Sequence, residues 1–194
     1  NSTENSEALS NQGNVNYKSK QYFKAIQDYS DAIKLCPNVA KYYTNRSACH
    51  SVMGNYTFAA EDAIKAIKIE PSFFKGYFHA INSFIYLGII DQAQFYITKM
   101  QKKIQEVEWH NFDGISKVKY LSSLDEKILK FLNERNFLEC LKYLEKALEI
   151  ATACKEYTCW KAQCLFELGR YNKAELLIYQ HPREPYSVYL QGLI

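Results

Sequence analysis

Amide and amino side chains recur at nearly equal intervals in the first half of the chain. They are Asn14, Asn45 and Lys75. Amide and ammonium groups donate hydrogen bonds, and charged donors bind carboxylates most strongly. If the fold brings these three side chains together, they would form a receptor for a carboxylate group.

The sequence has no residue set with the spacing of a catalytic or metal centre. None of the four histidines has a second His at a metal-binding interval, and the six cysteines include no C-x-x-C pair. Gly-rich phosphate loops and G-x-S-x-G motifs are also missing. We therefore predict no enzyme activity, no cofactor, no metal site, and cysteines that are reduced and mostly buried.

Composition narrows the class of protein further. The chain is 47% hydrophobic and 23% charged, which is enough to build a core. Seven Gly and four Pro are too few for a β-sandwich or barrel with many turns. No apolar run approaches the length of about 20 residues that a membrane span needs. The lysines that give the net charge of +3 are dispersed. We expect no membrane span, no nucleic-acid partner and a cytoplasmic location.

A period of about 34 residues runs along the chain and indicates the elements that would position the donors. Small residues recur at Ala25, Ala59 and Ala93, and the same step separates Pro37 from Pro71. Further on, the same step separates Cys140 from Ala174, but the interval between Ala93 and Cys140 is longer and implies an insertion. Small, aromatic and proline positions in this order are typical of the tetratricopeptide repeat.

This pattern predicts an all-α fold, a right-handed superhelix of antiparallel helix pairs known as a TPR solenoid. Small residues allow two helices to approach, and each proline ends a repeat because it cannot continue a helix. The first helix of every repeat would line a concave groove, so Asn14, Asn45, Lys75 and His79 would face one another. We expect the chain to be a monomer.

The predicted repeats fall into two groups. Repeats one to three occupy 6–107, an insertion occupies 108–120, and repeats four and five with the first helix of a truncated sixth occupy 121–194. The insertion is either a loop or an extension of the flanking helices, with Trp109 and Phe112 packed against the solenoid. Because the apolar segment from Tyr186 to Ile194 has no partner helix, we expect the chain to be part of a longer protein.

Two segments carry a more specific resemblance. Gly13-Asn14-x-x-Tyr17-Lys18 and Tyr42–Ala48 resemble TPR domains that bind chaperone C-termini through a carboxylate clamp. In that family, two Asn, two Lys and a further Lys or Arg grip the acidic tail of Hsp70 or Hsp90, which ends in Glu-Glu-Val-Asp.

Carried over to this sequence, the resemblance implies that Asn14, Asn45 and Lys75 belong to the clamp. Ser10 and His79 stand at positions that are usually basic, and Lys18 or Lys41 would restore part of the positive potential. A histidine with the ordinary pKa near 6.5 would strengthen tail binding as it charges at lower pH.

Later segments resemble a narrower group. Ala151–Cys154, Lys161–Leu165 and Leu168–Tyr171 look like the later repeats of co-chaperones that join a TPR array to a C-terminal J domain. His181-Pro182-Arg183 departs from the His-Pro-Asp of a J domain and is interpreted as a turn.

The resemblance thus implies a co-chaperone fragment that binds the C-terminal peptide of Hsp70 or Hsp90. The alternative is a scaffold that holds a partner helix or an extended segment through Phe78 and Tyr86 without reading a carboxylate.

Overall fold

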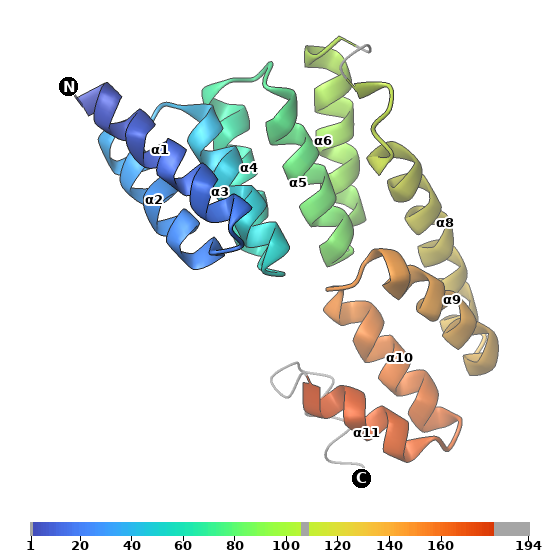
Figure 1. Cartoon of the computed structure of the whole chain (residues 1–194). Coiled ribbons are helices and arrows are strands. Elements are labelled where there is room, and N and C mark those ends of the chain that lie inside the picture. Colours follow the sequence, from blue (N-terminus) through green and yellow to red (C-terminus); the bar gives the residue numbers. More distant parts are fainter. Residues whose placement is uncertain (1, 106–108, 181–194) are drawn as a thin grey trace. The chain divides into compact units, whose positions relative to one another are not determined.

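The computed structural model describes residues 2–105 and 109–180, and within these ranges all regular structure is α-helical (Figure 1). The predicted first helix of a sixth repeat and His181-Pro182-Arg183 lie outside the described residues. The first helices of the five repeats are α1 (Ser2–Lys18), α3 (Ala40–Val52), α5 (Phe74–Leu87), α8 (Gly114–Asn133) and α10 (Lys155–Glu167). The second helices are α2 (Tyr22–Leu35), α4 (Tyr56–Ile69), α6 (Ile90–Lys103), α9 (Phe137–Ile150) and α11 (Tyr171–Gln180).

The helix boundaries follow the sequence period. The second helices start at the same intervals as the repeated small residues, at Tyr22, Tyr56, Ile90, Phe137 and Tyr171. α8 has 20 residues, against 13 in α3 and α10, and it begins inside the segment predicted as an insertion. The additional residues thus lengthen the helix that follows them.

The repeated small residues are the contact points of the helix pairs. Five of them are fully buried at equivalent places on the second helices: Ala25, Ala59, Ala93, Cys140 and Ala174. Two tyrosines at equivalent positions also link each repeat to the preceding one. The hydroxyl groups of Tyr43 and Tyr77 donate 3.0 Å hydrogen bonds to the carbonyls of Pro37 and Pro71. The same register therefore governs both packing and polar contacts.

Each turn inside a repeat contains one residue in the left-handed region. Gly54, Gly88 and Gly169 have φ between 71° and 75°, and the equivalent Lys20 and Arg135 have φ of 60° and 54°. Glycine adopts this conformation without strain, whereas a residue with a Cβ does not. Repeats one and four thus keep the same turn, although Lys20 and Arg135 disfavour the left-handed conformation that it requires.

The helices belong to two compact units. The first comprises residues 1–84 and 91–115, and the second comprises residues 85–90 and 116–194. The residues predicted to form the carboxylate clamp all lie in the first unit. The second unit has its own core around Leu121, Ile128, Leu144 and Tyr157, all at most 2% exposed.

Candidate functional site

Asn14 and Asn45 form a direct amide pair between α1 and α3. The Nδ2 of Asn45 donates to the Oδ1 of Asn14 at 3.1 Å. The Tyr29 hydroxyl donates to the same oxygen at 2.8 Å. With its oxygen held by two donors, Asn14 keeps its amino group as a donor for a ligand.

Gly13 makes this arrangement possible. A Cβ at this position would lie 2.7 Å from the ring of Tyr29, closer than real Cβ contacts come. The glycine therefore admits a buried tyrosine whose hydroxyl orients the next residue, Asn14. The role of Tyr29 depends on a contact between α1 and α2, which the spacing of residues in the sequence does not encode.

Lys41 and Lys75 supply the positive charge near the amide pair. They are equivalent residues of neighbouring repeats, and both are exposed. They line one hollow of about 490 Å³, together with Val39, Glu70 and Phe73. Lys41 precedes Asn45 by one helical turn on α3, which places the two side chains on one face of the helix. Amide and ammonium donors are therefore neighbours on the first helices of repeats one to three.

Lys18 and Ser10 flank Asn14 on α1, and their environments differ. Lys18 is exposed in the last turn of the helix, one turn after Asn14. Ser10 is 2% exposed, and its hydroxyl has no hydrogen-bond partner among the described residues. A buried short hydroxyl presents no donor at the surface, so Lys18 is the exposed cation on this helix nearest to Asn14.

His79 is held neutral. It is partly buried on α5, where the Phe78 ring contacts it edge-on with centroids 5.4 Å apart. Burial, together with the charge of Lys75, lowers the pKa of His79 to about 4. The expected titration near pH 6.5 is therefore wrong for this side chain, because the cation would be both desolvated and repelled.

Aromatic residues continue the surface of α5 beyond His79. Phe112 is 8% exposed and packs against Phe74 and Phe78, with ring centroids 6.1 and 5.5 Å apart. The Trp109 indole donates to the Ile104 carbonyl at 3.2 Å. The prediction that Phe112 packs against the helices is confirmed, and Phe78 stays 39% exposed beside the cluster. Trp109 is half-buried and contacts the residue that follows α6.

Known proteins share this architecture and parts of this sequence. The tetratricopeptide repeat family model matches residues 6–39. DnaJ homolog subfamily C member 7 of Mus musculus is 28% identical over 179 residues, which cover 88% of this chain and 34% of that protein. The crystal structure of the P58(IPK) TPR domain superposes with a TM-score of 0.76 at 20% identity, over 90% of this chain and 49% of that one. The chain therefore has the fold of a tetratricopeptide-repeat array, and its first repeat matches the family model.

The array also resembles known co-chaperones. Hsp70-Hsp90 organizing protein 3 of Arabidopsis thaliana is 43% identical over 65 residues, which cover 34% of this chain and 12% of that protein. The resemblance to DnaJ subfamily C proteins, inferred above from the later repeats, is confirmed by the match over most of the chain. The array spans about a third of the length of that relative.

Arg46, next to Asn45, fixes the helix that carries the amide. Its guanidinium binds the two oxygens of Asp62 on α4 at 2.7 and 2.8 Å, and donates to the Ser30 hydroxyl on α2 at 2.9 Å. Asp62 is only 7% exposed, so the Arg46 guanidinium compensates for the burial of its carboxylate, which the Nε2 of His50 approaches to 4.0 Å. In the sequence, the ion pair is indicated by Asp62, an acidic residue among the alanines of α4.

The rest of the array offers no other obvious centre. Within residues 2–105 and 109–180, no group of three or more His, Cys, Asp or Glu side chains could hold a metal ion. No helix in the same ranges is long and apolar enough to cross a membrane.

Proposed function

We propose that the array is a co-chaperone adaptor that binds the acidic C-terminal tail of Hsp70 or Hsp90 on repeats one to three. The amide pair of Asn14 and Asn45, beside Lys41 and Lys75, is the observation that carries this proposal. The names of the relatives support the same partners, because they include a DnaJ homologue and an Hsp70-Hsp90 organizing protein. We place the adaptor in the cytoplasm, and we assign it no catalytic step.

The tail would bind as an extended segment with its terminal carboxylate at the amides. Asn14 offers its amino group there, and the Nδ2 of Asn45 lies 3.1 Å from the Asn14 oxygen. The acidic side chains of the tail would then reach the hollow between Lys41 and Lys75. We assign the terminal carboxylate to the amides and the acidic side chains to the lysines because of their chemistry. Neutral amides orient a carboxylate, whereas ammonium groups contribute charge without fixed geometry.

The proposed site has fewer charges than the clamp of the family it resembles. Ser10 is buried and His79 is neutral, so Lys41, Lys75 and Lys18 would provide the positive potential. A charge-assisted hydrogen bond contributes about 1.5–3 kcal/mol against about 1 for a neutral one. We therefore expect weaker binding than in a clamp with all its cations, and strong dependence on salt.

Calorimetry with a short peptide ending in Glu-Glu-Val-Asp tests the proposal. Loss of one ammonium contact in Lys75→Ala should weaken binding about tenfold, since about 1.4 kcal/mol corresponds to one decade. Lys41→Ala should have a similar effect of about three- to tenfold. The matched control is Lys65→Ala, which removes the same charge from an exposed position on α4 and should leave affinity unchanged.

Amidation of the peptide separates this function from the scaffold alternative. If the site binds the C-terminal carboxylate of the peptide, the amidated peptide should bind much more weakly than the peptide with a free C-terminus. If the aromatic residues around Phe78 hold an extended segment instead, both forms should bind alike and Phe78→Ala should weaken both. Equal binding of the two peptides, unaffected by Lys75→Ala, would contradict the proposed function.

A further inference from the structure

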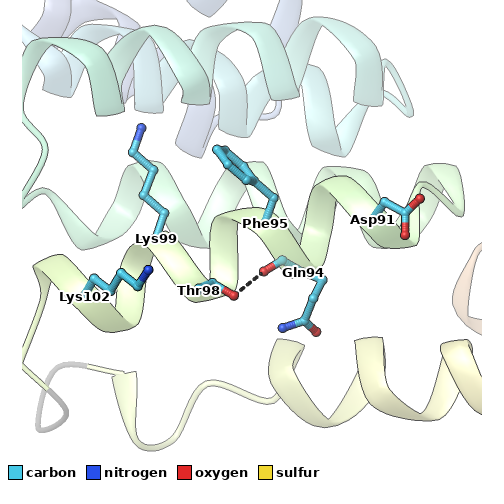
Figure 2. A pocket seen from close by; sticks show the side chains of 6 residues that line it. All are labelled: Asp91, Gln94, Phe95, Thr98, Lys99 and Lys102. Carbon is cyan, nitrogen blue, oxygen red and sulfur yellow. Dashed lines mark hydrogen bonds between the residues drawn. The ribbon is translucent and has the colours of Figure 1, made fainter.

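One face of α6 presents a row of polar and aromatic side chains outside the proposed tail site. Figure 2 shows six side chains from this helix around a hollow of about 410 Å³. They are Asp91, Gln94, Phe95, Thr98, Lys99 and Lys102. At its centre Phe95 is 56% exposed, whereas four other residues of the same helix are buried.

The charges along this row are separated. Asp91 lies in the first turn of α6 and Lys102 in the last, at opposite ends of the row in Figure 2. Lys99 is directed over the Tyr96 ring, with its Nζ 5.8 Å from the centroid. Neither Asp91 nor Lys102 has an ion-pair partner within the described part of the chain. Both charges are therefore available to a partner.

The order of these residues is self-complementary. Asp91 and Lys102 lie at equal distances from the midpoint between Tyr96 and Ile97, and so do Phe95 and Thr98. When two copies of one helix pack antiparallel about a two-fold axis, residues at equal distances from that midpoint face each other. Asp91 would then lie opposite the second copy's Lys102 at both ends.

We propose that α6 is a homodimer contact that pairs with α6 of a second copy of this chain, antiparallel and two-fold symmetric. The two exposed Phe95 rings would meet near the axis and cover one another and Thr98. Charge complementarity selects this occupant, because the same helix carries an acid at one end and bases at the other. The contact shares no residue with the proposed tail site, so one array could use both.

The dimer should be weak. A row from residue 91 to residue 102 is about 17 Å long at a rise of 1.5 Å per residue. A contact of this length is at the small end of specific interfaces, where association is transient. Self-association would therefore depend on concentration, and a dilute sample would contain the monomer predicted from the sequence.

Sedimentation equilibrium over a range of protein concentrations tests this contact. The average mass of the intact chain should rise from 22.6 kDa toward twice that value, and should rise less in high salt. Asp91→Lys alone and Lys102→Asp alone each place like charges opposite one another and should weaken association by about tenfold or more. The double variant restores opposite charges at both ends and should recover the dimer.

Two further variants complete the test. Phe95→Ser should abolish association without unfolding the chain, because the ring is mostly exposed; circular dichroism checks the helices. The control Lys65→Asp reverses a charge on α4 and should leave the dimer unchanged. A wild-type chain that stays at 22.6 kDa throughout, or a double variant no better than the single ones, would overturn the proposal.

Discussion

The first helices of repeats two and three and those of repeats four and five carry opposite chemistry at equivalent positions. Lys41 and Lys75 correspond to Ser122 and Glu156 when the repeat period and the insertion before repeat four are taken into account. Asn45 and His79 correspond in the same way to Glu126 and Trp160. Glu126 and Glu156 are exposed, so the first helices of repeats four and five present acids where those of repeats two and three present amides and bases.

This difference shows which positions specify the fold and which specify the ligand. The buried positions stay small in both groups: Ala25 and Ala59 in one, Cys140 and Ala174 in the other, all fully buried. The exposed positions on the first helices change charge without disturbing that packing. Under the proposed function, an acidic tail would therefore be attracted by the first helices of repeats two and three and repelled by those of repeats four and five.

The largest expected effect comes from making repeat two resemble repeat four. Asn45→Asp replaces an amide donor by a carboxylate, which repels the tail and cannot donate to Asn14. Binding of the Glu-Glu-Val-Asp peptide should fall by about a hundredfold or more, since like charges at a contact act over several kcal/mol. Calorimetry measures it, and Glu126→Gln is the control at the equivalent position, expected to change affinity less than about twofold. A loss below threefold in Asn45→Asp would count against the amide pair as the receptor.

A second variant tests the packing behind the amide pair. Gly13→Ala forces a Cβ to within 2.7 Å of the Tyr29 ring and should lower stability by about 2 kcal/mol. Tail affinity should fall as well, because the Tyr29 hydroxyl orients Asn14. Gly169→Ala is the control in the second unit: a Cβ there meets nothing within 4 Å, so only the left-handed φ opposes it, at about 1 kcal/mol. Urea unfolding gives both values, and equal losses would remove the special role of Gly13.

Acid should loosen the first unit before the second. His50 and His79 both lie in the first unit, and burial lowers the pKa of each; that of His79 falls to about 4. Between pH 6.5 and about 4 the unfolded chain binds the protons that the folded unit excludes, so stability falls as pH drops through this window. His110, also in the first unit, is the remaining histidine among the residues that the structure describes.

The two tryptophans separate the units in this experiment. Trp109 lies in the first unit and Trp160 in the second, so Trp160→Phe and Trp109→Phe each leave one fluorescent reporter. The urea midpoint reported by Trp109 should fall more between pH 7 and pH 5 than that reported by Trp160. His79→Gln should reduce the difference, and parallel curves for the two reporters would refute the assignment of acid sensitivity to the buried histidines.

The smallest expected effect concerns the turns that both groups share. Lys20→Gly and Arg135→Gly relieve a left-handed residue in repeats one and four, and should raise stability by about 0.5 kcal/mol after the added freedom of the unfolded chain is deducted. Gly54→Ala should lower stability by about 1 kcal/mol. Thermal melting checks all three, and a loss of stability in Lys20→Gly would show that its side chain stabilises the turn.

The fold can be predicted well from the sequence, because the small residues that recur with the repeat period are the ones that are buried between helices. Ala25, Ala59 and Ala93 could be recognised as contact points, and the second helices begin on the same register. The meeting of Asn14 with Asn45 follows from that register as well. These predictions need only the positions of residues on helices.

Other properties of the site depend on contacts that no spacing encodes. The low pKa of His79 comes from its burial and from Lys75, and the orientation of Asn14 comes from the Tyr29 hydroxyl on α2. The hollow shared by Lys41 and Lys75 depends on how the turns before α3 and α5 lie. Whether the segment before α8 forms a loop or a helix was also open, because its sequence has no strong helix start.

Nuclear magnetic resonance of the intact chain tests the central claim most directly. On titration with the Glu-Glu-Val-Asp peptide, the side-chain amide signals of Asn14 and Asn45 should shift together with the backbone signals around Lys41 and Lys75. The signals around Glu126 and Glu156 should stay in place. Shifts confined to repeats four and five, or silent amides at Asn14 and Asn45 while the peptide binds, would contradict the account.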